Sequence, residues 1–435
     1  MSDYIFMLES HLSTEQSRAV EHAQAAAEQA NVNVFLTGGA MRDMLAGFRI
    51  RDLDFTVEGN GLKVAKAFAE RTGARTVSTD EARKSAEMVT PEGVSVEIAM
   101  SRQEKYSKTG AKPQISPATL QEDLRRRDFT CNAIALSLNK ASRGLLLDPM
   151  NGLADIERRE LRLTSPYGLY DDPSRLLRLF RFRVRLGFAI EERTQMQVAN
   201  ARESEVEKLI PARALAEELK CIGTEDSPSE ILRALDEARL LTLFSQSLEG
   251  PKSNLAGVGK LEKIARLAPD EPRFRNARLG PFLYALTEKL NPKEKQALVK
   301  KLELQKAEID PWQKLDARAK KLESALRSAR IRKPSHVYFL LAGAAPDEVL
   351  FLLYHSALKP VQERIRNYFQ KYLPALQEIT PEEWEAAESK AGPRRAKARD
   401  EFIAYRLDRR VPKPEPVPPP PPPVETVVVR GRRQI

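Results

Sequence analysis

The sequence predicts an α/β domain at the N-terminus followed by a long all-helical region. Up to about Pro149, short runs rich in β-branched residues alternate with helical stretches. From Asp155 to about Leu407 the pattern is almost entirely helical. Beyond Val411 the chain is rich in proline and ends in basic residues, a composition typical of extended, disordered segments. We therefore expect four parts: an α/β head (1–150), a helical neck (151–215), a helical body and tail region (216–410) and a disordered tail (411–435).

Composition limits the classes of protein and of site. The chain has 435 residues, of which 30% are charged and 6% aromatic, which indicates a soluble, helix-rich protein of two or three domains. The N-terminus lacks the pattern of a secretory leader, and no apolar run reaches the roughly 18 residues that span a bilayer, so we expect a cytoplasmic location and no membrane partner. Two cysteines and four scattered histidines exclude a disulfide framework and a zinc cluster, so a metal would need oxygen ligands. A formal net charge of +10 favours a polyanionic partner such as nucleic acid.

Three stretches of the head are predicted to be strands. NVNVFLT, residues 31–37, alternates into a buried strand, the Gly38-Gly39 turn follows it, and a helix covers residues 40–46. A second strand starts near Asp52. In the third stretch, GVSVEIAM over residues 93–100, alternation places the apolar residues on one face and Glu97 on the other.

The second strand carries a pair of carboxylates. Asp52 and Asp54 are two residues apart, so on a strand their side chains point the same way. Two carboxylates so close repel each other unless a cation lies between them, and Mg²⁺ is commonly held by one or two carboxylates together with substrate phosphates. We therefore predict a magnesium site at Asp52 and Asp54, with Glu97 as the third acid of a cluster for two ions about 4 Å apart. A polar strand edge is the alternative explanation, above all for Glu97.

The Gly38-Gly39 turn supplies a place for phosphates. It lies between a strand and the N-terminus of a helix, where backbone N–H groups can approach a triphosphate, and Arg42 adds positive charge. An isolated Gly-Gly is usually only a turn. The order and spacing of this turn and the two aspartates together favour a nucleotide site.

Two further stretches carry paired or repeated charges. In EDLRRRDFTCNA, residues 122–133, Asp123 and Arg126 are three apart on a helical turn and should pair, either to bind ribose hydroxyls or as a surface salt bridge. DDPSRLLRLFRFRVRLGF, residues 171–188, begins with acidic residues and an early proline, which predicts a helix. Its five arginines, at 175, 178, 181, 183 and 185, favour a polyanion-facing surface over a plain solvated face.

With these motifs in order, the sequence resembles the class II tRNA nucleotidyltransferase and poly(A) polymerase family. The family signatures G-G-x-x-R-D with D-x-D, R-R-D-F-T-x-N-A, D-P…G…D and E-D-x-x-R have counterparts in GGAMRD with DLD, RRDFTCNA, DPMNGLAD and DDPSR. The likeness runs from about Val34 to Phe188 and weakens further along. It implies a polymerase-β-like nucleotidyltransferase head followed by helical neck, body and tail regions.

The resemblance also implies roles for individual residues, matched motif by motif. The candidates are the metal-binding catalytic carboxylates Asp52 and Asp54 with Glu97 as third acid, the triphosphate turn Gly38, Gly39 and Arg42, the ribose pair Asp123 and Arg126, and the base-reading pair Asp172 and Arg175, to which we add Arg178. The family's glutamate before the base-reading aspartate is Asp171 here.

Hydrogen-bond polarity predicts which bases Asp172 and Arg175 accept. Three apart on one helix, they offer a carboxylate acceptor beside a guanidinium donor, which matches cytosine and adenine and mismatches uracil and guanine. The expected activity is template-independent addition of C and/or A from CTP and ATP to the 3′ end of tRNA, with Mg²⁺ as cofactor and release of pyrophosphate. Alternatives are an A-adding enzyme, a CC-adding enzyme or a poly(A) polymerase with the same chemistry, and, from another class, a catalytically silent RNA-binding protein. The sequence indicates no protein partner.

Overall fold

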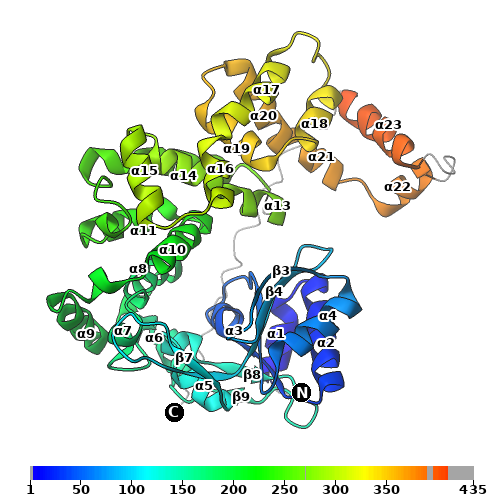
Figure 1. The fold of residues 1–435 in the computed structure, drawn as a ribbon. Coiled ribbons are helices and arrows are strands. Elements are labelled where there is room, and N and C mark those ends of the chain that lie inside the picture. The colour runs from blue at the N-terminus through cyan, green and yellow to red at the C-terminus, as the bar shows by residue number, and fades with distance from the viewer. Residues whose placement is uncertain (1–2, 270, 389–394, 410–435) are drawn as a thin grey trace, which may run out of the picture. The chain divides into compact units, whose positions relative to one another are not determined.

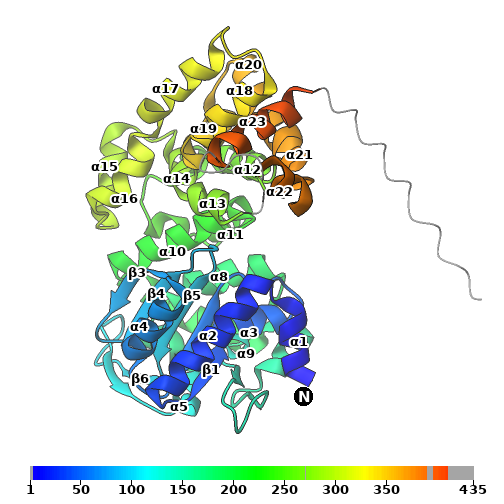
Figure 2. The same cartoon turned by 90° about the vertical axis from the view of Figure 1, so that its right-hand side faces the viewer.

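The computed structural model of this protein describes residues 3–269, 271–388 and 395–409. They form an α/β head and a helical remainder, so the predicted fold class is confirmed (Figure 1 and Figure 2). Internal contacts distinguish two compact units, Met1–Glu323 with Ala345–Ala357, and Ser324–Ala344 with Leu358–Ile435. The segment 411–435, expected to be disordered, lies outside the described residues.

A seven-stranded mixed sheet forms the centre of the head, with strand order β3-β4-β5-β2-β1-β8-β9. The strands are β1 (Val34–Thr37), β2 (Leu53–Val57), β3 (Arg75–Asp80), β4 (Ser85–Val89), β5 (Ser95–Met100), β8 (Ala135–Ser137) and β9 (Leu146–Leu147). β2 and β5 run parallel, and the other neighbouring pairs are antiparallel. The three predicted strands correspond to β1, β2 and β5, while β3 and β4 form an additional hairpin that the sequence analysis does not single out.

The register of the sheet brings residues that are distant in the chain side by side. Asp54 of β2 lies beside Glu97 of β5 on one side and beside Thr37 of β1 on the other. The alternation predicted for residues 93–100 is present, because Val96 and Ile98 are buried and Glu97 is partly exposed. The polar edge of this part of the sheet therefore carries two neighbouring carboxylates.

Helices cover the sheet and connect it to the rest of the first unit. α2 (Thr14–Ala30) and α4 (Gly61–Thr72) pack against each other, α2 also contacts β1 and β2, and α4 contacts β4 and β5. α2 begins with a capping box in which Ser13 and Gln16 each bond the other's backbone N–H. The other elements of the head are α1 (Asp3–His11), α3 (Gly38–Leu45), β6 (Arg102–Lys105), β7 (Gln114–Pro117), α5 (Leu120–Arg125) and η1 (Thr130–Asn132).

The DPMNGLAD stretch holds α6 (Gly152–Arg158) against η1. The Asp148 carboxylate accepts the backbone N–H groups of Gly152 at 2.7 Å and Leu153 at 2.9 Å, which caps the helix. Gly152 is required by space, because a Cβ there would lie 2.1 Å from the carbonyl oxygen of Thr130. Asp155 in turn accepts the Thr130 hydroxyl at 2.7 Å. This motif therefore positions the RRDFTCNA stretch.

The remainder of the chain is mostly helical. The first unit continues with β10 (Glu160–Leu161), α7 (Gly168–Asp171), α8 (Arg175–Leu186), β11 (Ala189–Ile190), α9 (Glu192–Glu203), η2 (Val206–Leu209), α10 (Ala212–Thr224), α11 (Pro228–Glu237), η3 (Leu241–Leu243), η4 (Gly250–Ser253), α12 (Leu255–Ala265), α13 (Pro272–Arg275), η5 (Asn276–Arg278), α14 (Leu279–Thr287), α15 (Pro292–Lys301), α16 (Lys306–Gln313) and α19 (Pro346–His355). α17 (Leu315–Arg327) runs from the first unit into the second, which contains α18 (Pro334–Ala342), α20 (Lys359–Asn367), η6 (Tyr368–Tyr372), α21 (Leu373–Gln377), α22 (Pro381–Glu388) and α23 (Arg395–Asp408). In the described part of the chain no single helix is long and apolar enough to cross a membrane; only α18 and α19, separated by a sharp bend, reach that length and composition when taken together.

Candidate active site

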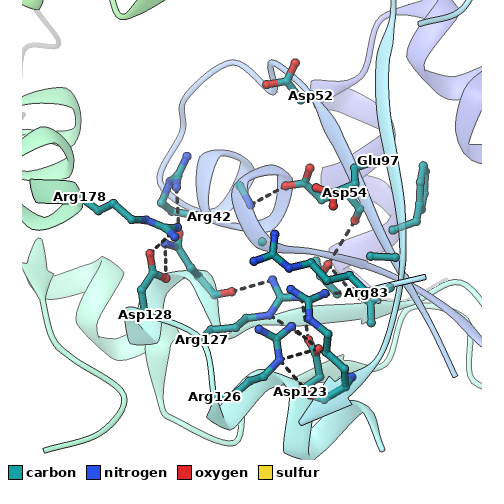
Figure 3. Close-up of a pocket in the computed structure, with 18 of the residues that line it drawn as sticks. Arg42, Asp52, Asp54, Arg83, Glu97, Asp123, Arg126, Arg127, Asp128 and Arg178 are labelled. Atoms are coloured by element: carbon teal, nitrogen blue, oxygen red, sulfur yellow. Dashed lines mark hydrogen bonds and ion pairs between the residues drawn. The ribbon is translucent and has the colours of Figure 1, made fainter. Parts of the chain in front are cut away.

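One cavity of about 520 Å³ in the first unit gathers every candidate site residue of the sequence analysis (Figure 3). They come from β2, β5, α3, α5, α8 and the segments between them, and they are Gly38, Gly39, Arg42, Asp52, Asp54, Glu97, Asp123, Arg126, Asp172, Arg175 and Arg178. Stretches separated by more than a hundred residues thus share one site.

Asp54 and Glu97 form the acidic centre of this cavity. Desolvation within the site, followed by the negative charges of Glu97 and Asp52, raises the pKa of Asp54 to about 7. Desolvation and the neighbouring Glu87 likewise raise the pKa of Glu97. Among the described residues, neither carboxylate has an ion-pair partner within 4.0 Å. Two adjacent carboxylates without such a partner fit a divalent cation, so the donor set agrees with the metal dependence expected of this fold.

Asp52 takes a different orientation from the one predicted. Figure 3 shows its carboxylate apart from those of Asp54 and Glu97. β2 begins at Leu53, so Asp52 lies in the bend before the strand, where strand alternation does not apply. Consistent with this, no three acidic, histidine or cysteine side chains within the described ranges are close enough to form a ready metal cluster. Asp52 still lines the same cavity and acts on Asp54 electrostatically.

The two glycines lie directly against Asp54. α3 begins at Gly38 itself, which has a φ of +64°, a left-handed conformation that glycine adopts without strain. The backbone N–H of Gly39 donates a hydrogen bond of 3.1 Å to Oδ2 of Asp54. The turn predicted for a triphosphate therefore also holds a catalytic carboxylate candidate.

Arg42 is engaged inside the protein. Its side chain is buried, and its guanidinium donates to Oδ1 of Asp43 at 2.7 and 2.8 Å and to Oδ1 of Asn132 at 2.9 Å. It also lies 4.8 Å from the centre of the Phe182 ring. Arg42 lines the cavity and contributes positive charge to it. Its N–H groups, however, donate to Asp43 and Asn132, and these hydrogen bonds orient the guanidinium.

The predicted pairing of Asp123 with Arg126 is present, with Nη2 of Arg126 at 2.5 Å from Oδ1 of Asp123. The other oxygen of Asp123 accepts Nη2 of Arg127 at 3.0 Å, and Oδ1 also accepts the backbone N–H of Arg102. Asp123 is buried, and although burial would raise its pKa, the charges of Arg127 and Arg126 hold the pKa below its usual value. Because the carboxylate is buried, the pair is not a surface salt bridge.

Asp172 and Arg175 do not share a helix as predicted. Asp172 lies in extended backbone between α7 and α8, which begins at Arg175. Oδ1 of Asp172 accepts the N–H and hydroxyl of Ser174 at 3.0 and 2.6 Å, and its Oδ2 is 4.0 Å from Nε of Arg175. The two terminal nitrogens of Arg175 donate to the carbonyl oxygens of Arg126, at 2.7 Å, and Arg127, at 3.2 Å. Arg175 thus holds the backbone at Arg126 and Arg127, and both Asp172 and Arg175 line the cavity.

Most arginines of α8 are engaged in ion pairs, and Arg175, Arg178 and Arg185 also line the cavity, so the polyanion-facing surface predicted for this helix stays a prediction. Arg178, Arg181 and Arg185 each bind acidic residues from other elements, and only Arg183 is exposed. The pairs are Arg178 with Asp128 (2.6 Å), Arg181 with Glu218 (2.6 Å) and Glu225 (3.1 Å), and Arg185 with Asp43 (2.7 Å) and Glu225 (3.7 Å). The partners are distant in sequence, so counting charges along the helix alone does not detect them.

Several residues of the cavity are not singled out by the sequence analysis. Glu104 of β6 binds Arg102 at 2.9 Å and Arg126 at 3.2 Å, and it accepts the hydroxyl of Tyr106 at 2.9 Å. Arg83, from the turn between β3 and β4, lies near the carboxylates in Figure 3 and lowers the pKa of Glu97 against the effect of burial. Arg127 belongs to the RRRD run, so the sequence contains a signal that could have identified it. Arg83 and Tyr106 carry no such signal, because only the fold brings them to the cavity.

Comparison with known proteins adds a family assignment. The family described as the Poly A polymerase head domain matches residues 34–162. The head of this chain is therefore similar to that family over these residues. The resemblance stated from the sequence is thereby confirmed for residues 34–162. This stretch contains the Gly38-Gly39 turn, Asp52, Asp54, Glu97 and the RRDFTCNA motif.

Relatives and solved structures extend the likeness beyond the poly(A) polymerase head. The chain is 29% identical over 343 residues to the A-adding tRNA nucleotidyltransferase of Aquifex aeolicus, covering 78% of this chain and 40% of that protein. It is 37% identical over 201 residues to the CC-adding tRNA nucleotidyltransferase of Deinococcus radiodurans, covering 46% of this chain and 52% of that protein. The chain therefore spans about half the length of these relatives. The CCA-adding enzyme in its apo form II has the same fold, with a TM-score of 0.55, 22% identity and coverage of 93% of this chain and 95% of that chain.

Proposed function

We propose that this protein is an enzyme that transfers nucleotides from CTP and/or ATP to the 3′ end of tRNA and releases pyrophosphate. The observation that carries the proposal is that all eleven candidate residues, from five separate stretches of the chain, line one cavity. The relatives named A-adding and CC-adding tRNA nucleotidyltransferases support the same substrate class. We further propose that residues 216–410 contact the RNA and that the protein acts in the cytoplasm.

The carboxylates supply the site of reaction. Asp54 and Glu97, with Asp52 at the same cavity, would hold Mg²⁺, which when bound supplies positive charge for the attacking 3′-hydroxyl and the leaving pyrophosphate. Gly39 keeps Asp54 in place through its N–H, and Gly38 leaves the space that Asp54 and Arg127 occupy. Burial and the neighbouring carboxylates raise the pKa of Asp54 to about 7, and a cation bound beside it would favour the ionised form at neutral pH.

The nucleotide would lie along the arginines of the opposite part of the cavity. Arg126 and Arg127 are fixed by Asp123 through both of its oxygens and by the carbonyl contacts of Arg175. Fixed guanidinium groups lose little conformational entropy when they bind phosphate or ribose oxygens. Asp172 offers Oδ2 as an acceptor for the amino group that cytosine and adenine share.

An extension assay tests the proposal directly. Purified protein is given three tRNAs that end before the first C, before the second C and before the terminal A, each with labelled CTP, ATP, GTP or UTP. Addition of C, of A or of both, stopping after the CCA end, is the expected result, and the pattern separates CC-adding, A-adding and CCA-adding activity. A long tail of A would identify a poly(A) polymerase, and an inactive protein that binds the tRNAs would instead identify a silent RNA-binding protein.

A further inference from the structure

Arg83 reaches the active-site cavity from the hairpin formed by β3 and β4. The last paired residues of this hairpin are Asp80 and Ser85, so Arg83 lies in the turn between the two strands. β4 also pairs with β5, whose Glu97 lies beside Asp54 of β2. The Arg83 side chain lines the cavity, and Figure 3 shows it near these two carboxylates. The hairpin therefore brings a positive charge to the acidic centre of the site.

Arg83 differs from the other arginines of the cavity in its bonding. Nine arginines of the described part of the chain line the cavity, and eight of them each have a hydrogen-bond or ion-pair partner in the protein at 3.0 Å or less. Among the described residues, the Arg83 guanidinium donates no hydrogen bond, and its one ion pair, with Asp80, is 3.8 Å long between Nε and Oδ2. The Arg83 side chain is also 49% exposed. Its N–H donors are therefore available to a ligand.

The backbone that carries Arg83 is held in place by contacts on both sides of the residue. Oδ1 of Asp80 accepts the backbone N–H of Arg83 at 2.9 Å. The next residue, Lys84, has a φ of +46°, and its carbonyl oxygen lies against Gly61, the first residue of α4. A Cβ on Gly61 would be only 2.2 Å from that oxygen. The turn is thus packed against the head, and the guanidinium alone is left without a close partner.

The proposed reaction places a phosphoryl group beside these carboxylates. The 3′-oxygen of the RNA forms a bond to the α-phosphorus of the nucleotide while the bond from this phosphorus to the bridging oxygen of the pyrophosphate breaks. Pyrophosphate leaves with the electron pair, and the hydroxyl proton passes to water. The non-bridging oxygens of the transferred group carry negative charge, and hydrogen-bond donors that face them stabilise the transition state. Ionised Asp54 and Glu97 are acceptors only, so they cannot supply these donors.

We propose that Arg83 is a catalytic residue that donates hydrogen bonds to the non-bridging oxygens of the α-phosphoryl group during its transfer. A guanidinium suits this task, because its planar fork matches two phosphate oxygens at once. This inference rests on the proposed function. The oxygens of the leaving pyrophosphate have the same chemistry, so the experiments must separate the two groups.

The first experiment measures kcat and KM for CTP or ATP and for tRNA with the full-length protein. Arg83→Ala should lower kcat by about 100-fold or more, the usual effect of removing one transition-state donor, and change both KM values by less than about threefold. Arg83→Lys keeps the charge without the planar fork and should be intermediate. Lys84→Ala is the matched control, because it removes one positive charge from the same turn but does not line the cavity, and it should act like the wild type. Thermal melts check that each variant is folded, and a kcat of folded Arg83→Ala within threefold of the wild type would overturn the proposal.

The second experiment replaces one non-bridging oxygen of the α-phosphate by sulfur, a weaker hydrogen-bond acceptor. The two diastereomers of the α-thio nucleotide are used separately. The rate ratio of oxygen to sulfur substrate should be smaller in Arg83→Ala than in the wild type for at least one diastereomer, because the variant has no hydrogen bond there to lose. A purely structural role of Arg83 would leave these ratios unchanged. Equal ratios in both enzymes for both diastereomers would contradict the proposal.

A third measurement separates the transferred phosphoryl group from the leaving group and tests the two hypotheses apart. Inhibition of the extension reaction by added pyrophosphate should be the same in Arg83→Ala and the wild type. Weaker inhibition of the variant, with unchanged oxygen-to-sulfur ratios, would show that Arg83 holds the pyrophosphate, and would overturn the inference while leaving the proposed function intact. A wild type that adds no nucleotide to any tRNA would refute the proposed function itself.

Discussion

Gly38 lies directly against Asp54, so that a Cβ added to Gly38 would be 3.0 Å from Oδ2 of Asp54. The same Cβ would be 3.1 Å from Nη1 of Arg127. The glycine therefore does more than relieve backbone strain, because it leaves the space in which a carboxylate and an arginine meet.

Gly38→Ala should reduce nucleotide addition by at least about tenfold by displacing Asp54. Gly47→Ala is the matched control, because Gly47 also has a positive φ, +74°, but a Cβ there would meet nothing within 4 Å. Both variants should lose roughly 1–2 kcal/mol of stability from the left-handed backbone. Steady-state kinetics and urea unfolding measure the two effects, and equal activity in both variants would refute a steric role for Gly38.

Asp54→Asn should abolish addition while RNA binding survives, because Asp54 would hold the cation in the active-site cavity and would not contact the body of the RNA. In metal-free protein at neutral pH, the same variant should be at least as stable as the wild type, because it removes repulsion with Glu97 and Asp52. Loss of activity with unchanged or higher melting temperature thus separates a chemical role from unfolding. Activity within tenfold of the wild type would overturn the assignment of Asp54.

Stability of the metal-free protein should fall as pH rises toward neutrality. The pKa of Asp54 is raised to about 7 in the folded state, above its ordinary value of 3.8, so between these values the folded state binds more protons than the unfolded state. The unfolding free energy then decreases with rising pH, and this contribution is complete above about pH 7. Urea unfolding in a chelator from pH 5 to 8 measures it. The advantage of Asp54→Asn over the wild type should grow over this range and shrink when Mg²⁺ is added; a difference that is independent of pH would count against the coupling.

Glu225→Ala should destabilise the protein strongly. This carboxylate is buried and binds Arg51 at 2.8 Å, Arg181 at 3.1 Å and Arg185 at 3.7 Å, so its removal takes one acidic partner from each of three guanidinium groups, at a cost of roughly 3–5 kcal/mol. Asp226→Ala, its exposed neighbour that also binds Arg51, is the control and should cost at most about 1 kcal/mol. Chemical denaturation measures the unfolding free energy of both variants. Similar losses of unfolding free energy would show that burial of the carboxylate does not decide the effect.

Asp172 and Arg175 should respond differently to mutation. Asp172→Ala should relax the discrimination against UTP and GTP. It should leave the fold intact, because the Asp172 carboxylate contacts Ser174 and lies 4.0 Å from Nε of Arg175. Arg175→Ala should also lower the melting temperature, because the backbone carbonyl oxygens of Arg126 and Arg127 each lose a hydrogen-bond donor. Incorporation of all four nucleotides and thermal melts test both statements; unchanged selectivity in Asp172→Ala would rule out a base-reading role.

Local sequence was enough to predict the parts of the site. The strand before Gly38, the pairing of Asp123 with Arg126 and the inward and outward faces of residues 93–100 all depend on residues within a few positions of one another. Backbone alternation and helical spacing set these relationships without help from the rest of the chain. The order of the four motifs along the chain also indicates the family.

Only the tertiary structure decided how the parts act on one another. The parallel pairing of β2 with β5 places Glu97 beside Asp54, and the bend before β2 sets Asp52 apart from both carboxylates (Figure 3). α8 finds acidic partners on α3, on α10 and directly after α10. Each depends on contacts between residues far apart in the chain, which are selected by burial and charge over the whole first unit. A count of charges along one helix cannot contain that information, because Coulomb attraction depends on distance in space and the fold sets that distance.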